Sequence, residues 1–149
     1  EPIRRVLIAF PLENGEVERM YAVVSSEGLC ILDNSPFYAF GISCGDVISV
    51  DEVDGDLVFS EVISRGGHST YRIKLPIGRS HDYFLEHWPP LEWLGCTYEG
   101  SSANKERLYS LDLPPSVDVL EVYRRLEQGE LGGEWIFEEA HYFNSSATP

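Results

Sequence analysis

The stretch from residue 33 to residue 72 constrains the fold more than any other part of the chain. It reads DNSPFYAFGISCGDVISVDEVDGDLVFSEVISRGGHSTYR, and turn signals divide it into short runs rich in β-branched and aromatic residues. Pro36 holds the residue before it in an extended conformation, so no helix runs through this point. The Asp-Gly pair at 54–55 is a strong signal for a tight hairpin between strands at 47–53 and 57–64. The stretch therefore predicts β-sheet.

Further strands are expected on both sides of this stretch. Three precede it, at 4–10, 18–26 and 29–32, and one follows the Gly-Gly turn, at 70–75. Many short strands joined by tight turns favour a small antiparallel barrel, which we place in residues 1–69.

The chain after residue 75 changes character because segments with helical periodicity appear. We expect one helix at 80–87, stopped by Pro89, and another at 117–128, with Gly129 as its C-cap. The alternative is that Glu130 and Leu131 extend the last turn of the second helix. The strands expected between and after them are at 92–98, 107–113 and 134–143. Counted from the strand at 70–75, the order is β-α-β-β-α-β, which is the ferredoxin-like order.

The sequence therefore predicts an α+β fold in one domain, residues 1–149. A small antiparallel β-barrel in 1–69 would be fused to a ferredoxin-like half in 70–143, and 144–149 would form a flexible tail. A length of 149 residues and a hydrophobic content of 43% are sufficient for a folded domain of this size. The apolar runs are too short to cross a bilayer.

The cysteines indicate the redox compartment of the protein, and the net charge indicates which partners it can bind. Cys30, Cys44 and Cys96 are widely spaced and form no CxxC pair, which argues against a disulfide framework and a zinc site. A reducing compartment fits best, so we expect a cytoplasmic protein. The net charge of −14 repels nucleic acid and anionic lipid, and it favours a basic protein partner.

Two acidic clusters are the predicted partner-binding residues. The first is in the 47–64 hairpin, and the second lies near the C-terminus, where no Lys or Arg follows Arg125. Clustered carboxylates accelerate association with a basic partner and form charge-assisted hydrogen bonds to it. The alternative interpretation is two ordinary solvated faces. The clusters comprise Asp51, Glu52, Asp54 and Asp56, and then Glu127, Glu130, Glu134, Glu138 and Glu139.

A ligand pocket is a second hypothesis. The turn at 66–70 could present amide and hydroxyl groups to an anion, and a carboxylate beside a histidine can perform acid–base chemistry. Asp46 and His68 are accordingly the candidate residues of a hydrolase. The alternative is a turn in which these side chains bind only the local backbone. The predicted pocket residues are Asp33, Phe37, Tyr38, Asp46, His68 and Ser69.

No metal or cofactor is expected from the sequence. His81 and His87 are six residues apart, which does not place them on one face of a helix. The acidic hairpin lacks the spacing of a calcium-binding loop.

The sequence resembles the bacterial DUF4265 family. The resemblance rests on DNSPFYAFGISCGDVISV, GDLVFSEVISRGGHSTYRI, LGCTYEG and GEWIFEEAHY, and it spans roughly residues 5–142. It implies a bacterial origin and no settled activity. The chain also resembles the small acidic immunity proteins of bacterial toxin systems.

Three functional hypotheses follow. The leading one is an immunity-type inhibitor that neutralises a cognate toxin, for example a basic nuclease, by masking its active or substrate-binding surface. The second is a small-ligand-binding or regulatory domain that uses the turn at 66–70. The third is a hydrolase that uses Asp46 and His68.

Overall fold

The computed structural model describes residues 3–26, 28–101 and 106–144. Mostly antiparallel strands and a smaller helical part make up this portion of the chain, so the predicted α+β class is confirmed. The elements are β1 (Arg5–Pro11), β2 (Val17–Ser26), β3 (Leu29–Leu32), β4 (Val47–Val53), β5 (Asp56–Ser64), β6 (Ser69–Lys74), α1 (His81–His87), α2 (Pro89–Trp93), β7 (Thr97–Ser101), β8 (Leu108–Leu113), α3 (Val119–Leu131) and β9 (Ile136–His141).

Strands β1 to β5 form one sheet that closes on itself. Each strand pairs antiparallel with the next, and β1 pairs in parallel with β5 through Ile8 opposite Leu57 and Ala9 opposite Val58. The parallel pair departs from the purely antiparallel arrangement that we predicted. It is unavoidable because a ring with an odd number of strands cannot alternate direction at every step.

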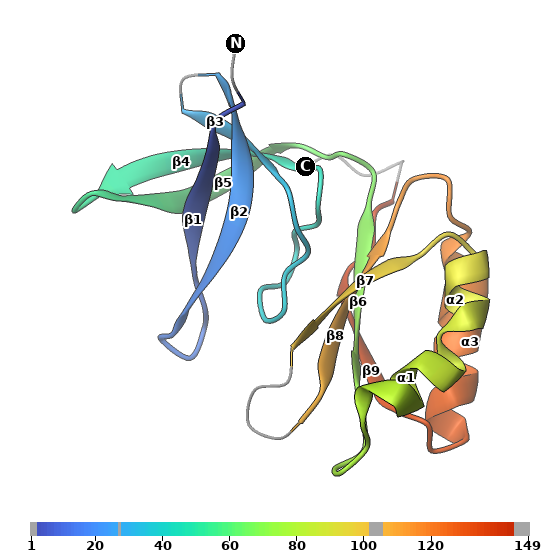
Figure 1. Cartoon of the computed structure of the whole chain (residues 1–149). Coiled ribbons are helices and arrows are strands. Elements are labelled where there is room, and N and C mark those ends of the chain that lie inside the picture. Colours follow the sequence, from blue (N-terminus) through green and yellow to red (C-terminus); the bar gives the residue numbers. More distant parts are fainter. Residues whose placement is uncertain (1–2, 27, 102–105, 145–149) are drawn as a thin grey trace.

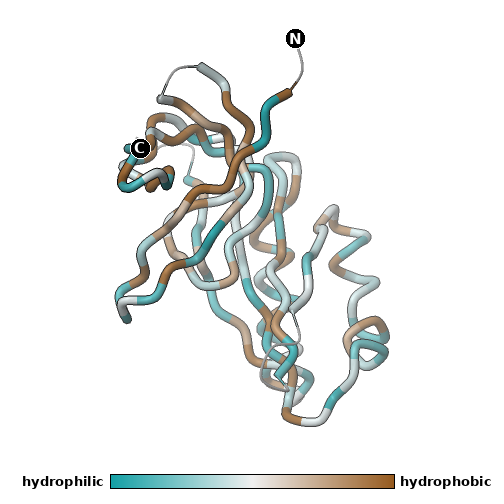
Figure 2. The backbone as a smooth tube through the Cα atoms, turned by 60° about the vertical axis from the view of Figure 1, so that its left-hand side comes forward, coloured by the Kyte–Doolittle hydropathy of each residue, from teal (hydrophilic) through white to brown (hydrophobic). Residues whose placement is uncertain are grey.

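The second sheet has the strand order β7-β8-β6-β9, and all of its pairs are antiparallel. All the labelled helices, α1 to α3, lie on one face of this sheet (Figure 1). Side chains alternate along β6, so Tyr71 and Ile73 point into the core beneath the helices while Arg72 and Lys74 point to the opposite, helix-free face. In Figure 2, hydrophobic stretches are interspersed with hydrophilic positions along the chain.

The two sheets have separate hydrophobic cores. The core of the first contains Ile8, Met20 and Ile48, whereas Leu111 and Trp135 belong to the core beneath the helices. The loop between β3 and β4, residues 33–46, runs between the sheets (Figure 1). It carries most of the predicted pocket residues.

The predicted strand at 92–98 is wrong. Helix α1 ends at His87, before Pro89, as predicted, but Pro89 then begins a second helix, α2, because a proline at the first position of a helix needs no amide hydrogen. Within α2, Leu91 is buried and Trp93 is 82% exposed. Strand β7 begins only at Thr97.

The long helix ends at Leu131, in the extension through Glu130 and Leu131 that was the alternative to a C-cap at Gly129. Helix α3 begins after Asp118, whose carboxylate accepts hydrogen bonds from the first-turn amides, and it continues past Gly129 to the C-cap Gly132. Gly129 is buried inside the helix beneath Trp135. The predicted flexible tail at 144–149 lies outside the described residues except for Asn144, which has a contact partner. Among the described helices, none is long and apolar enough to span a membrane.

Candidate functional site

The loop at 33–46 is anchored to the first sheet by Glu18 of β2. The Glu18 carboxylate accepts hydrogen bonds from the amides of Phe37, Tyr38 and Ala39, at 2.6, 3.0 and 2.8 Å. A carboxylate has only acceptors, so it satisfies three successive amides that the loop itself cannot pair. The aromatic residues 37 and 38 are thereby fixed in position.

The same loop is anchored to the second sheet by Arg72, which is only 1% exposed. Its guanidinium donates to the carbonyls of Ala39 at 2.7 Å and Pro36 at 3.3 Å, and its Nε donates to Glu138 at 2.7 Å. The ring of Phe40 lies 4.6 Å from the guanidinium. Sequence reasoning missed this arginine, although its position two residues before Lys74 on a strand places both cations on one face.

Asp46 makes contacts that hold the loop in place. It is fully buried, and its carboxylate accepts hydrogen bonds from the amides of Ser43 at 2.9 Å and Gly66 at 3.1 Å. Arg65 completes the arrangement with an ion pair at 2.9 Å. These contacts join the loop to the turn at 66–70 and leave Asp46 with no exposed surface for a substrate.

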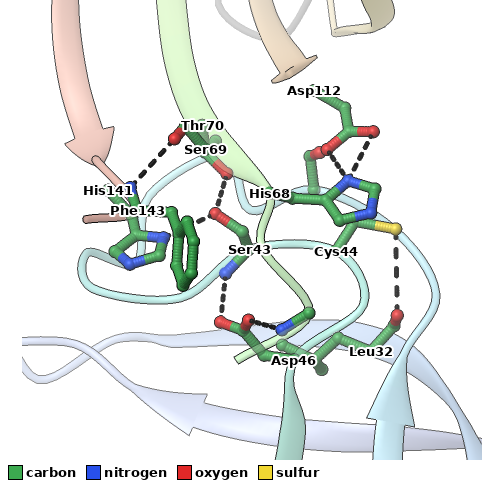
Figure 3. Close-up of polar contacts among 12 residues, drawn as sticks. Leu32, Ser43, Cys44, Asp46, His68, Ser69, Thr70, Asp112, His141 and Phe143 are labelled. Carbon is green, nitrogen blue, oxygen red and sulfur yellow. Dashed lines mark hydrogen bonds and ion pairs between the residues drawn. The ribbon is translucent and has the colours of Figure 1, made fainter. Parts of the chain in front are cut away.

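His68 pairs with a different carboxylate. Its Nδ1 lies 2.8 Å from Asp112 of β8, and its ring packs against Gly45, where an added Cβ would lie 3.1 Å from the ring (Figure 3). Burial raises the pKa of Asp112, while the hydrogen bond to His68 lowers it. Because Asp46 and His68 have separate partners, the geometry gives no support for a shared acid–base role.

Cys44 lies in the same region but is not activated. Burial, and then the charges of Asp112 and Asp33, raise the pKa of the Cys44 thiol to about 11. The thiol donates weakly to the carbonyl of Leu32, at 3.8 Å. A thiol with a raised pKa is a poor nucleophile at neutral pH.

The remaining residues of the predicted pocket are dispersed. Ser69 is buried, and its hydroxyl accepts a hydrogen bond from the amide of Phe143 at 2.9 Å. Asp33 forms a half-exposed ion pair with Arg5 at 3.2 Å. The six predicted residues therefore do not line one pocket.

A cavity of about 480 Å³ lies on the helix-free face of the second sheet, beside the loop. It contains Phe37 and Tyr38 from the predicted pocket and Glu138 from the predicted acidic set. Its cations are already neutralised, because Lys74 pairs with Glu106 at 2.8 Å and Arg72 with Glu138. The residues that line it are Phe37, Tyr38, Arg72, Lys74, Ser101, Glu106, Leu108, Ile136, Phe137 and Glu138.

The two acidic clusters differ in structure. In the hairpin cluster, Asp51, Glu52 and Asp54 are exposed, and their side chains form no hydrogen bond or ion pair with any described residue. Asp56 lies 3.9 Å from Arg19. The hairpin of β4 and β5 extends away from the rest of the molecule (Figure 1).

The second cluster, Glu127 to Glu139, is here called the late cluster, and most of its side chains form contacts within the protein. Glu134 pairs with Arg125 at 2.7 Å, Glu130 accepts from the amide of Phe137, and Glu139 accepts from the hydroxyl of Tyr71. Glu138 pairs with Arg72, as described above. Glu127 is exposed and, within the described chain, makes no such contact. The described residues contain no group of three or more His, Cys, Asp or Glu side chains suited to a metal ion.

Comparisons with known proteins identify a family and a fold. A crystal structure described as that of a hypothetical protein from Neisseria gonorrhoeae is similar to this chain with a TM-score of 0.69 and 16% identity, and the match covers 97% of this chain and 99% of the other. At this identity the likeness concerns the fold alone. No curated protein matches the sequence. The family model described as a domain of unknown function, DUF4265, matches residues 18–137. That match spans most of the sequence, and the chain therefore belongs to the DUF4265 family.

Proposed function

We propose that this protein binds a basic protein partner through the hairpin of β4 and β5, as an immunity-type inhibitor of a bacterial toxin. The observation that carries the proposal is the exposed group of Asp51, Glu52 and Asp54 at the end of a projecting hairpin, where these side chains have no partner among the described residues. Val53, which is half exposed between them, offers an apolar contact. The contacts within the late cluster make that cluster the less suitable surface.

The mechanism follows from electrostatics. A partner such as a basic nuclease presents a cationic groove, and the hairpin carboxylates would occupy it and exclude the substrate. The net charge of −14 would attract this partner over long range. Such association is fast at low salt and slows as the ionic strength increases.

The test begins with a pull-down of the tagged protein from its native bacterium at low salt, with the captured partner identified by mass spectrometry. The association rate is then measured for the triple variant Asp51→Asn, Glu52→Gln, Asp54→Asn. The matched control Glu13→Gln, Glu16→Gln, Glu86→Gln removes the same charge from exposed positions elsewhere. We expect the hairpin variant to associate at least about tenfold more slowly, and the control within about twofold of wild type. Equal rates for the two variants would exclude the hairpin as the binding surface.

A second candidate function is small-ligand binding in the 480 Å³ cavity. The specific observation is that Phe37 and Tyr38 line a cavity of the size that small molecules occupy. A metabolite screen by thermal shift tests it. A genuine ligand would lose its effect in Ile136→Trp, which fills the cavity rim, and would keep its effect in His68→Ala, which lies outside the cavity. A ligand that responds in the opposite way would refute binding at this place.

We also propose a fold type for each of the two sheets and a cellular location. We assign β1 to β5 to a small barrel, supported by the pairing of β1 with β5. Residues 70–143 would be a ferredoxin-like unit with an extra short helix, α2, supported by the strand order β7-β8-β6-β9. Localisation in the cytoplasm, with its reducing environment, agrees with the three free thiols.

A further inference from the structure

A second cavity, of about 320 Å³, lies where α1 meets the paired strands β7 and β8. Its described lining contains two basic side chains, Arg107 and His81, and no carboxylate. This composition is unusual in a chain with 25 acidic and 11 basic residues. The residues that line it are His81, Tyr98, Gly100, Ser101, Arg107 and Tyr109.

Arg107 forms no ion pair with any residue that the structure describes. Within the described chain it has no carboxylate at ion-pair distance, whereas Arg72 and Lys74 in the larger cavity each have one. An arginine that shares a cavity with other hydrogen-bonding groups and has no internal anion is free to bind an external one.

The wall of the cavity is rigid. The hydroxyl of Tyr109 lies 2.9 Å from Nδ1 of His81, and its ring stacks on Phe84 with centroids 3.6 Å apart and planes 4° apart. Gly100 leaves room for that ring, because an added Cβ would lie 3.1 Å from it. Arg107 lines the same cavity as Tyr109; burial raises the pKa of Tyr109, and the charge of Arg107 and a hydrogen bond with it lower that pKa. Two polar groups are therefore held in fixed positions next to Arg107.

We propose that this cavity binds a small oxyanion, namely phosphate or the phosphate group of a small molecule. Arg107 supplies the charge and a planar set of donors, while His81 and Tyr109 of the same lining supply further polar groups. The net charge of −14 opposes anion binding over long range, and the exposed Asp82 adjoins His81. Affinity is therefore modest, with a dissociation constant on the order of 1 mM.

The experiment follows the side-chain NMR resonances of His81 and Tyr109 during titration with inorganic phosphate, with sodium chloride holding the ionic strength constant. We expect saturable shifts in the wild type. Arg107→Gln should weaken binding at least about tenfold, whereas Arg107→Lys, which keeps the charge, should weaken it less.

The matched control is Arg4→Gln. Arg4 is an exposed arginine in the other sheet region with no carboxylate at ion-pair distance among the described residues, so this variant removes the same charge far from the cavity. Its dissociation constant should stay within about twofold of wild type. Shifts that do not saturate, or an equal loss in Arg107→Gln and Arg4→Gln, would overturn the proposal. A titration with glucose 6-phosphate compares a phosphorylated compound with free phosphate, and the probe with the lower dissociation constant is the preferred ligand. Shifts at the same residues with either probe support the site.

Discussion

Glu18 and Arg72 bind the same segment of backbone, residues 36–39, although they belong to different sheets. Glu18 accepts hydrogen bonds from the amides of the segment, and Arg72 donates to its carbonyls. A carboxylate only accepts and a guanidinium only donates, so the two side chains are complementary to the two kinds of backbone group. Because the hydrophobic cores of the sheets are separate, this polar arrangement is a main connection between them.

Replacing Arg72 with Met should destabilise the protein strongly. The substitution removes the donor to the Ala39 carbonyl and the ion-pair partner of Glu138, while the Pro36 carbonyl keeps the hydroxyl of Ser110 as a donor. We expect this loss to cost about 3 kcal/mol of unfolding free energy. Urea denaturation measures the loss. The control is Arg124→Met, which breaks an exposed pair with Glu121 and should cost less than about 1 kcal/mol. Similar losses for the two variants would mean that Arg72 does not hold the loop.

Local features of the fold were predictable from the sequence. The bounds of β3 and β4 agree with the prediction, because the turn residues that flank these strands have strong local preferences. The family was predictable as well, because the segments that carry the resemblance, such as residues 33–50 and 55–73, lie within the matched residues 18–137. Helix α2 was not predictable, because burial of Leu91 outweighed the usual effect of two successive prolines.

The partners of the polar residues were not predictable in the same way. His68 and Asp112 are 44 residues apart, and their pairing depends on the register of β6 with β8. We predicted that Asp46 and His68 act together only because both residues lie near turns. The late glutamates looked like a binding surface because a sequence does not reveal that Arg72 and Arg125 neutralise two of them.

Replacing Gly129 with Ala should destabilise the protein, although alanine is the better helix former. Helix propensity alone favours alanine by roughly 1 kcal/mol. The new Cβ would lie 2.4 Å from the indole of Trp135, so the packing must shift, and we expect a net loss of about 2 kcal/mol in urea denaturation. The control Gly132→Ala, at the exposed C-cap with φ of −84°, should change stability by less than about 0.5 kcal/mol. A stabilised Gly129→Ala variant would contradict the packing of Trp135 against the helix.

The thiols should react slowly in the folded protein. Burial raises the pKa of Cys96 to about 12, and burial together with nearby carboxylates raises that of Cys44 to about 11. Only the thiolate is alkylated, so near pH 8 iodoacetamide should modify both residues at least about tenfold more slowly than in the urea-unfolded chain. Mass spectrometry of timed samples measures the rates. Modification of Cys44 at the unfolded rate would instead indicate an activated thiol and revive a catalytic hypothesis.

His141 should make the protein sensitive to acid. Its Nδ1 lies 2.8 Å from the hydroxyl of Ser43, at the junction of β9 with the loop (Figure 3). Burial, and then the charge of Arg65, lower the pKa of His141 from 6.5, while Asp46 and Glu139 act in the opposite direction. A lowered pKa means that the folded state resists protonation. The stabilising contribution is therefore complete above pH 6.5 and is lost as the pH falls through the folded-state pKa.

The measurement compares the unfolding free energy of the wild type and of His141→Gln at about pH 7.5 and about pH 5. Glutamine can keep a hydrogen bond to Ser43 but does not titrate in this range. The unfolding free energy of the wild type should fall more between the two pH values than that of the variant. Above neutral pH the unfolding free energies of the two proteins should change with pH in the same way. An identical pH dependence in both proteins would show that His141 protonates as readily in the folded state as in the unfolded chain, in which case its burial at the junction does not couple acid to stability.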